Sequence, residues 1–440
     1  MTALRLFLPD RADYRASITA LRNLLRAGEL TSGTSTGTKV ADVVRGILEQ
    51  VAQGGDEAAA RLTSELDRAK ISPASLRVPR EVLERAHRAA DPDLMGLVRR
   101  AAANVRAYQE HILLKAPEPL QRDGRRLGVR YTPLRRVAVY VPGGRALYPS
   151  TVVMTVVPAV VAGVREIAMF SPPTGGEIAD LALALAWELG VHEVYRLGGA
   201  VGLAAAAFGT ASIAPVDKIV GPGNAYVAEA KRQLFGKVGI DSIAGPSEVF
   251  IVADDSANPR WLAADLIAQA EHDPGSAILA TPSLSLAEAV LREVERELES
   301  LERAAAARRS LERYGAVIVT RDLDEACSLA NEFATEHLQI ITRDDDRCLG
   351  QIEAAGAIFV GAHTPVPLGD YYAGPSHVLP TGGTARFSAP LSANDFLKVS
   401  SLIRYQASDL AADSRDVMAF ARREGLTAHA RAVGIRSEDG

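Results

Sequence analysis

Short apolar runs alternate with longer amphipathic stretches along two successive parts of the chain. The first part carries strand-like runs at 137–141, 167–171, 193–197 and 218–220, with helical patterns at 177–189 and 225–234. The second part carries strand-like runs near 249–253, 277–280, 316–320, 338–341 and 357–360, with helical patterns near 261–271, 284–308 and 323–332. Because alternating strands and helices form parallel sheets with helices on both faces, this pattern predicts two α/β domains.

The regions that flank these two arrays carry helical patterns. Residues 21–30 belong to a predicted N-terminal helical arm, and a Ser/Thr/Gly linker at 31–38 precedes a helical pattern that begins at Val40. The helical pattern continues over 79–109, and a stretch rich in Pro and Arg at 116–136 indicates a boundary. After Leu391 the strand pattern ends and a helical one remains, which predicts a small C-terminal appendage.

The longest apolar run, 152–164, is interrupted by Thr155, Pro158 and Gly163. It is shorter than the roughly 20 residues that a membrane-spanning helix needs, so we expect a buried helix near a cofactor site. The first ten residues lack the charged, apolar and small-residue pattern of an export signal. We therefore expect no membrane association.

Composition excludes several classes of protein. The 440 residues are 48% hydrophobic and 23% charged, as in an ordinary globular protein. The formal net charge of −5 argues against a nucleic-acid binder, which needs a surplus of cations. Two cysteines, Cys327 and Cys348, are too few for a disulfide scaffold or a cysteine-rich zinc site. A reducing compartment, the cytoplasm, is the simpler interpretation.

Three glycine-containing turns follow predicted strands of the first array. They read Pro-Gly-Gly at 142–144, Gly-Gly-Ala at 198–200 and Gly-Pro-Gly-Asn at 221–224. Glycine lets a backbone approach a phosphate closely, and open α/β sheets bind ligands beyond the carboxyl ends of their strands. None of the turns has the G-x-G-x-x-G spacing, so a nucleotide site and ordinary strand-to-helix turns remain comparable interpretations.

The residues best suited to metal or acid–base chemistry are dispersed along the second half of the chain. They are Gln269 and His272 on one face of a predicted helix, Glu336 and His337 at the start of a strand, Asp370 and His377 in one loop, and His429. Two His, one Asp and one Gln could hold zinc, although that set is rich in oxygen. Taken singly, each histidine is more simply explained as a hydrogen-bonded or surface residue, as we expect for His87, His111, His192 and His363.

Longer motifs occur in a fixed order over about residues 30–435. They lie at 140–144, 216–227, 244–248, 269–272, 336–338, 369–371, 377–384 and 426–429. In these motifs the chain closely resembles the L-histidinol dehydrogenase family, which catalyses the last two steps of histidine biosynthesis. The resemblance implies two successive NAD-dependent oxidations, from L-histidinol through L-histidinal to L-histidine, with one zinc ion per site. It also implies a homodimer.

The resemblance assigns roles residue by residue. It implies zinc ligands at Gln269, His272, Asp370 and His429, and a catalytic pair at Glu336 and His337. Substrate contacts would come from those four ligands and from Ser247, His337, His377 and Glu424. Tyr140 and Asn224 match NAD contacts, and Val201 stands where the family usually has a Gln that contacts NAD. Because the family's C-terminal segment reaches the partner's site, Glu424 and His429 would act in trans.

The chemistry agrees with these residue types. A histidine can accept the alcohol's proton near neutral pH, which makes His337 the candidate base. Glu336 could then activate the water that hydrates the aldehyde. Val201 removes one hydrogen bond to NAD, worth roughly 0.5–1.5 kcal/mol. Ser376, where many family members carry Asn, could adjust the substrate pocket.

The expected domain organisation follows from the patterns and the resemblance together. Residues 1–30 would form the N-terminal arm. A first α/β domain, for substrate and zinc, would consist of residues 31–136 and 247–391, and a second, for NAD, of residues 137–246. Residues 392–440 would form a helical segment that reaches the partner. Both α/β domains would be incomplete Rossmann-like folds. The alternatives are a zinc- and NAD-dependent dehydrogenase of another small alcohol, such as a sulfonated diol, a zinc hydrolase, and a non-catalytic metal-binding relative.

Overall fold

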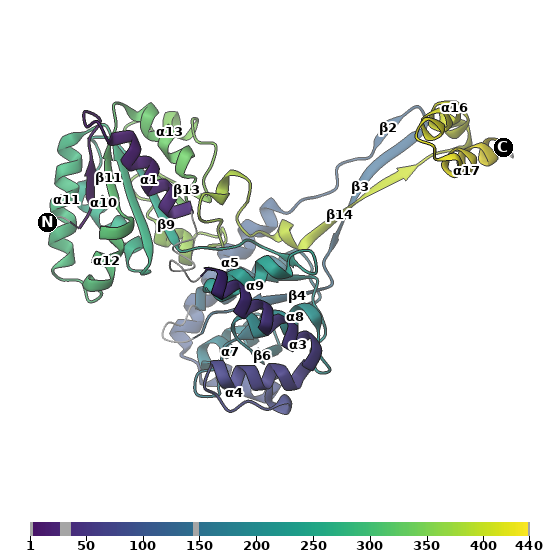
Figure 1. Cartoon of the computed structure of the whole chain (residues 1–440), viewed down its shortest axis with the longest axis horizontal. Helices are drawn as coiled ribbons and strands as arrows, with labels where there is room; N and C mark the ends of the chain where they lie inside the picture. Colours follow the sequence, from purple (N-terminus) through teal and green to yellow (C-terminus); the bar gives the residue numbers. More distant parts are fainter. Residues whose placement is uncertain (1–2, 27–36, 144–148, 439–440) are drawn as a thin grey trace.

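A six-stranded parallel sheet organises one half of the computed structural model, which describes residues 3–26, 37–143 and 149–438 (Figure 1). In spatial order its strands are β1 (Arg5–Phe7), β11 (Ala316–Val319), β10 (Gly275–Thr281), β9 (Ser247–Ala253), β12 (His337–Ile341) and β13 (Ala357–Val360). One face packs against α10 (Pro259–Ala270), α11 (Leu284–Leu298) and α12 (Ala304–Tyr314). The other packs against α1 (Tyr14–Arg26), α13 (Leu323–Phe333) and α14 (Asp345–Leu349). Since both faces are covered, the central strands are nearly continuous in apolar residues.

A five-stranded parallel sheet organises the other half. Its strands, in spatial order, are β6 (Glu193–Arg196), β5 (Glu166–Ser171), β4 (Arg136–Tyr140), β7 (Lys218–Val220) and β8 (Gly239–Ile240). One core contains α4 (Arg80–Ala89), α5 (Pro92–Ile112), α6 (Pro149–Val161) and α7 (Asp180–Glu188). The opposite core contains α3 (Gly37–Leu66), α8 (Gly199–Phe208) and α9 (Ala225–Leu234). The two parallel sheets confirm the predicted α/β fold class.

A third, antiparallel sheet forms an arm that projects from the body (Figure 1). It consists of β14 (Leu397–Arg404), β3 (Arg125–Pro133) and β2 (Leu120–Arg122). Two packed helices, α16 (Ala407–Arg423) and α17 (Thr427–Glu438), lie at its tip. The remaining elements are α15 (Val366–Tyr371) and 3₁₀ turns at Pro73–Ser75, Thr384–Arg386 and Ala393–Phe396.

The elements differ from the sequence prediction in several places. The N-terminal arm is not purely helical, because β1 pairs with β11 at the edge of the six-stranded sheet. The helical pattern over 284–308 divides into α11 and α12. The C-terminal segment begins with β14, which was expected to be helical, and the boundary region contains β2 and β3. Because nearly every residue of β14 is exposed, it lacks the alternation by which a half-buried strand is recognised.

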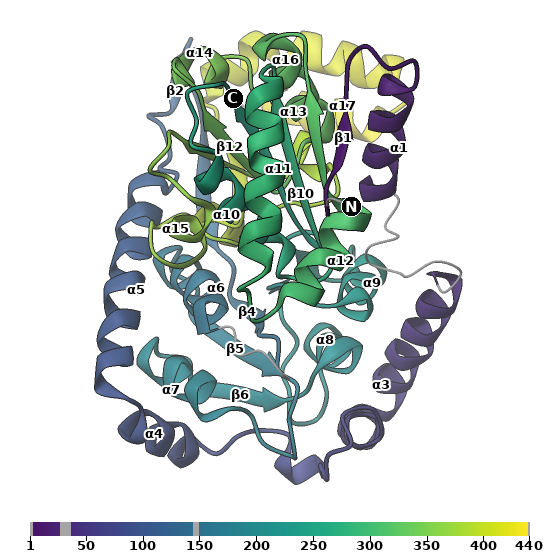
Figure 2. The same cartoon turned by 90° about the vertical axis from the view of Figure 1, so that its left-hand side faces the viewer.

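The long helices near the N-terminus pack differently from our expectation. We grouped residues 31–136 with 247–391, but α3, α4 and α5 pack on the five-stranded sheet (Figure 2). An amphipathic pattern identifies which face of a helix is buried, not the surface against which it is buried. The grouping could therefore not be read from the pattern.

Two further features bear on function. The apolar run at 152–164 lies mostly in α6, whose residues 151–159 are all buried, and none of the described helices is long and apolar enough to cross a membrane. The chain also passes directly from one parallel sheet to the other, since β8 ends at Ile240 and β9 begins at Ser247. Residues 241–246 thus join the carboxyl edge of the five-stranded sheet to the amino edge of the six-stranded sheet.

Candidate active site

His337 occupies the first position of β12, at the amino edge of the six-stranded sheet, and is 3% exposed. Its Nδ1 lies 2.9 Å from the backbone oxygen of Glu248. Because a carbonyl oxygen can only accept, Nδ1 carries the proton in this hydrogen bond. Among the residues that the structure describes, Nε2 has no hydrogen-bond partner; it lies 3.6 Å from Oδ1 of Asp370. In the neutral ring, Nε2 is therefore the nitrogen without a proton.

Two buried carboxyl groups lie beside this imidazole. Oε2 of Glu336 accepts a hydrogen bond from the backbone N–H of Glu248 at 3.0 Å, and Oε2 of Glu248 accepts from the N–H of Glu336 at 3.3 Å. Oε1 of Glu248 also accepts from the N–H of Gly382 at 3.1 Å. Strand β9 and the residue before β12 are therefore joined by reciprocal contacts, which hold Glu336 next to His337.

Burial is the largest single influence on the pKa of each of these groups. It raises the pKa of Glu336 to about 7, although His337 and a hydrogen bond with Ser247 act in the opposite direction. Burial and the charge of Glu336 together raise the pKa of Glu248 to about 8. Burial alone would lower the pKa of His337, but Glu336 and Asp370 raise it to about 9. The same carboxylates would stabilise the imidazolium that forms when His337 accepts a proton.

Asp370 and His377 connect this cluster to the five-stranded sheet. The backbone oxygen of Asp370, in α15, lies 2.9 Å from Nδ1 of His377, and Nε2 of His377 lies 3.4 Å from Oγ1 of Thr151 in α6. Burial would raise the pKa of Asp370, but His337, His377 and His272 hold it below its usual range. The site therefore lies where the two halves of the molecule meet.

Gln269 and His272 lie at the end of α10. The helix ends at Ala270, so His272 is in the following turn rather than on the helix, and its N–H donates to the oxygen of Gln269 at 3.4 Å. Gln269 is 3% exposed, and its Nε2 has no hydrogen-bond partner within the described part of the chain. Desolvation lowers the pKa of His272, whereas the nearby Asp370 carboxylate raises it. These contacts bring His272 and Asp370 into one neighbourhood.

The expected zinc ligands fit a metal site only in part within one copy of the chain. In the part of the chain that the structure describes, no three His, Cys, Asp or Glu side chains are grouped closely enough to hold a metal ion. His272 and Asp370 supply an imidazole and a carboxylate, and Gln269, whose Nε2 has no partner among the described residues, supplies a buried amide. A tetrahedral zinc site would need one more ligand.

Two predicted site residues are not brought to this cluster. Glu424 follows α16, and His429 lies in α17, so both belong to the tip of the arm (Figure 1). Both are exposed. Within one copy, the arm holds them away from the amino edge of the six-stranded sheet.

The predicted cofactor residues gather at the carboxyl edge of the five-stranded sheet. Tyr140 ends β4, and its hydroxyl oxygen accepts from the N–H of Gly199 at 3.2 Å. Oδ1 of Asn224 caps α9 by accepting from the N–H groups of Tyr226 and Val227 at 3.0 and 3.2 Å. Val201 is buried in α8. The three glycine turns thus lie on one edge, except that residue 144 falls outside the described residues.

Sequence reasoning missed two contacts of the site. Glu248 lies inside one of the quoted motifs, but no role was assigned to it; its signal is an acidic residue at the second position of an otherwise apolar strand. Thr151 could not be found from sequence, because only packing brings it to His377. Ser376 is buried and donates to the backbone oxygen of Met154 at 3.0 Å, so it joins the loop to α6.

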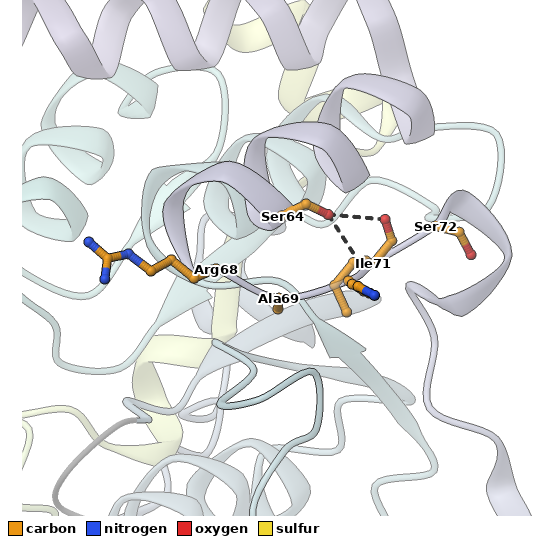
Figure 3. Close-up of a pocket in the computed structure, with 6 residues that line it drawn as sticks. Ser64, Arg68, Ala69, Ile71 and Ser72 are labelled. Atoms are coloured by element: carbon orange, nitrogen blue, oxygen red, sulfur yellow. Dashed lines mark hydrogen bonds between the residues drawn. The ribbon is translucent and has the colours of Figure 1, made fainter.

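A separate hollow lies beyond the end of α3 (Figure 3). It is lined by Ser64, Arg68, Ala69, Lys70, Ile71 and Ser72. The Ser64 hydroxyl closes the loop by donating to the oxygen of Ile71 and accepting from its N–H, each at 3.1 Å. No predicted site residue lines this hollow.

A buried imidazole with flanking carboxylates, where a parallel sheet meets a second one that carries glycine turns at its carboxyl edge, is an arrangement suited to a dehydrogenase. Residues 30–437 match the family model described as histidinol dehydrogenase. The chain belongs to the histidinol dehydrogenase family.

Individual relatives support this assignment over the full length. The chain is 49% identical to a histidinol dehydrogenase of Rhodopirellula baltica, with 98% of this chain and 96% of the relative covered. It is 47% identical to that of Bacillus subtilis, covering 89% and 92%. A crystal structure of histidinol dehydrogenase from Elizabethkingia anophelis is 28% identical, with a TM-score of 0.92, and covers 100% of this chain and 99% of that one.

Proposed function

We propose that this chain is an L-histidinol dehydrogenase of histidine biosynthesis, which oxidises L-histidinol to L-histidine through L-histidinal and reduces two NAD. Family membership over nearly the whole chain supports the reaction. The observation that carries the mechanism is the free Nε2 of His337, in a ring whose Nδ1 is held by the backbone of Glu248.

In the first oxidation, the neutral form of His337, whose share rises as the pH approaches its pKa of about 9, removes the hydroxyl proton of L-histidinol through Nε2. When bound, NAD would supply the acceptor for the hydride that leaves the substrate carbon in each oxidation. Loss of the proton and the hydride converts the alcohol to the aldehyde. Since Glu336 and Asp370 lie 3.6 Å from the two ring nitrogens, they stabilise the positive charge that the proton places on His337.

In the second oxidation, Glu336 serves as the base that activates a water molecule. Water adds to the aldehyde carbon to give the hydrate, which then loses a hydride and two protons, one to His337 and one to solvent, to become the carboxylate. A carboxyl group with a pKa near 7 can take up and release a proton under physiological conditions. The N–H of Glu248 fixes Oε2 of Glu336 in place.

We propose zinc as the metal, held by Gln269, His272, Asp370 and His429. When bound, zinc would anchor the imidazole and amino nitrogens of the substrate. Ser247, His377 and Glu424 would complete the substrate contacts, and Tyr140 and Asn224 would contact NAD. Gln269, with its unpaired amide, and Asp370, beside three histidines, are the described residues that best fit this role.

A homodimer would supply the missing ligand. The arm exposes large apolar side chains, with Val399 59%, Ile403 74% and Phe420 72% exposed, which is typical of a surface that another chain covers. We therefore propose that the arm of one copy reaches the site of its partner, so that Glu424 and His429 act in trans. The unpaired thiols of Cys327 and Cys348 support the cytoplasmic localisation that we propose.

The proposed function is tested by the NADH formed per mole of L-histidinol. We expect two NADH per substrate, loss of activity after treatment with a chelator, and recovery on adding zinc. Release of one NADH, or activity that a chelator leaves intact, would contradict the proposal. Two further substrates test the alternatives. NADH formation from a sulfonated diol would indicate a related dehydrogenase, and cleavage of an ester would indicate a zinc hydrolase.

A further inference from the structure

A buried ion pair forms hydrogen bonds with one glycine at the candidate cofactor edge. The side chains of Lys231, in α9, and Asp241, directly after β8, are 2% and 3% exposed and form a salt bridge. Nζ of Lys231 also donates to the backbone oxygen of Gly221 at 2.6 Å, while Oδ2 of Asp241 accepts from the N–H of Gly221 at 2.7 Å. Both backbone polar groups of Gly221 are therefore held by this pair.

Gly221 lies where a close backbone approach leaves no room for a side chain. Its φ is +117°, and a Cβ atom on it would lie 2.1 Å from the backbone oxygen of Tyr140. The turn 221–224 thus packs against the end of β4, and its last residue, Asn224, caps α9. The ion pair sets the position of this turn relative to both candidate NAD contacts, Tyr140 and Asn224.

The burial of the pair requires an explanation other than stability. Removing two charges from water is costly, and a buried ion pair is often no more stabilising than apolar residues of the same volume. Here the hydrogen bonds of the pair are directed at the backbone of one turn rather than at scattered partners. Their effect is to specify the geometry of that turn.

Asp241 is also the first residue of the segment 241–246, which leads into β9 at Ser247. The segment that begins at Asp241 therefore connects the cofactor edge to the strand that carries Ser247 and Glu248. We propose that Lys231 and Asp241 are positioning residues that determine the affinity for NAD by holding the turn 221–224. This inference rests on the proposed function, because it takes that edge to be the NAD site.

The test compares Asp241→Asn with the wild-type enzyme in steady-state assays with L-histidinol and NAD. The amide keeps the size of the side chain but loses its charge, and it leaves a buried donor of Gly221 or Lys231 without its acceptor. We expect the KM for NAD to rise about tenfold or more, because an unpaired buried donor weakens the geometry it held. The kcat at saturating NAD, the KM for L-histidinol and the zinc content should stay close to wild type.

A matched control is Glu193→Gln, which breaks the ion pair of Glu193 with Arg136 at the opposite end of β4. It should lower the Tm without changing the KM for NAD. The double variant Lys231→Met with Asp241→Leu replaces both charges by apolar groups and separates stability from positioning. It should keep the raised KM for NAD even where its Tm recovers, and it carries the test if Asp241→Asn does not fold.

An unchanged KM for NAD in Asp241→Asn, or a double variant that regains both Tm and KM, would overturn the inference. The proposed function fails by a different result, namely a wild-type enzyme that forms no NADH from L-histidinol. The two failures are therefore distinguishable.

Discussion

His337 shows how a single residue acquires its chemistry from its backbone surroundings. The carbonyl oxygen of Glu248 holds Nδ1–H at 2.9 Å, and this contact leaves Nε2 as the acceptor. A side-chain partner could be changed by one substitution, but a backbone carbonyl cannot, so the tautomer is a property of how β9 pairs with β12. The reciprocal contacts of Glu248 and Glu336 hold the neighbouring carboxylate in the same way.

The first prediction concerns His337→Asn. The amide can still donate to the oxygen of Glu248, but it cannot accept the proton of the alcohol, so NADH formation should fall about 10²–10⁴-fold. Circular dichroism and metal analysis should show an unchanged fold and zinc content. Turnover close to that of the wild type would show that His337 is not the base.

At the scale of elements, one carboxylate of α7 contacts two helices, α4 and α5, that lie far from it in the sequence. Glu188, at the end of α7, lies 2.6 Å from Nε2 of His87 in α4, and it accepts from Arg99 in α5 at 2.7 and 2.9 Å. Arg99, by hydrogen bond and charge, together with His87, lowers the pKa of Glu188 to about 2. The contacts of Glu188 with His87 and Arg99 help to explain why α4 and α5 pack on the five-stranded sheet.

The sign of the resulting pH dependence follows from the lowered pKa. The stabilisation by ionised Glu188 is present above its ordinary pKa of about 4.5 and is lost as the pH falls through about 2. Glu188→Gln should therefore lower the free energy of unfolding at pH 7, and its difference from wild type should shrink between about pH 4.5 and 2. Urea denaturation at several pH values measures this difference.

An exposed ion pair in the same region provides the control. Glu84 and Arg88 are paired within α4, with side chains 39% and 71% exposed. Glu84→Gln should change stability little at any pH, because exposed pairs of this kind contribute roughly 0–1 kcal/mol. If Glu84→Gln and Glu188→Gln change the free energy of unfolding equally at each pH, the proposed stabilisation by Glu188 is wrong.

At the scale of the whole molecule, the arm separates residues that the proposed chemistry requires together. Glu424 and His429 lie at its tip, whereas Gln269, His272 and Asp370 lie near the amino edge of the six-stranded sheet (Figure 1). A homodimer with exchanged arms resolves this separation, because a symmetric pair places the same tip at each partner's site.

The exchange can be tested by mixing two inactive variants, His337→Asn and His429→Ala. A mixed dimer has one site in which both residues are altered and one in which both are native. Random mixing should therefore restore activity to about a quarter of the wild-type value. Steady-state assays of the variants, unfolded and refolded together, measure the recovery, and a mixture as inactive as either variant alone would mean that His429 does not act in trans.

The sequence by itself determined the α/β class and the positions of the buried strands, such as β9 and β10. These strands are covered on both faces, so they are rich in apolar residues, and such runs are visible without a structure. The motifs likewise identified Glu336, His337 and the candidate ligands through the family resemblance. Short or exposed strands such as β1 and β14 were missed, because little or no buried face shapes their sequence.

Only the tertiary structure decided which surfaces meet. It alone placed α3, α4 and α5 on the five-stranded sheet, brought Thr151 to His377, and made the backbone of Glu248 the partner of His337. It also placed His429 on the arm, away from the other candidate ligands. The physical reason is that the periodicity of a sequence records whether a side chain is buried, whereas the identity of its neighbour depends on contacts between residues far apart in the chain.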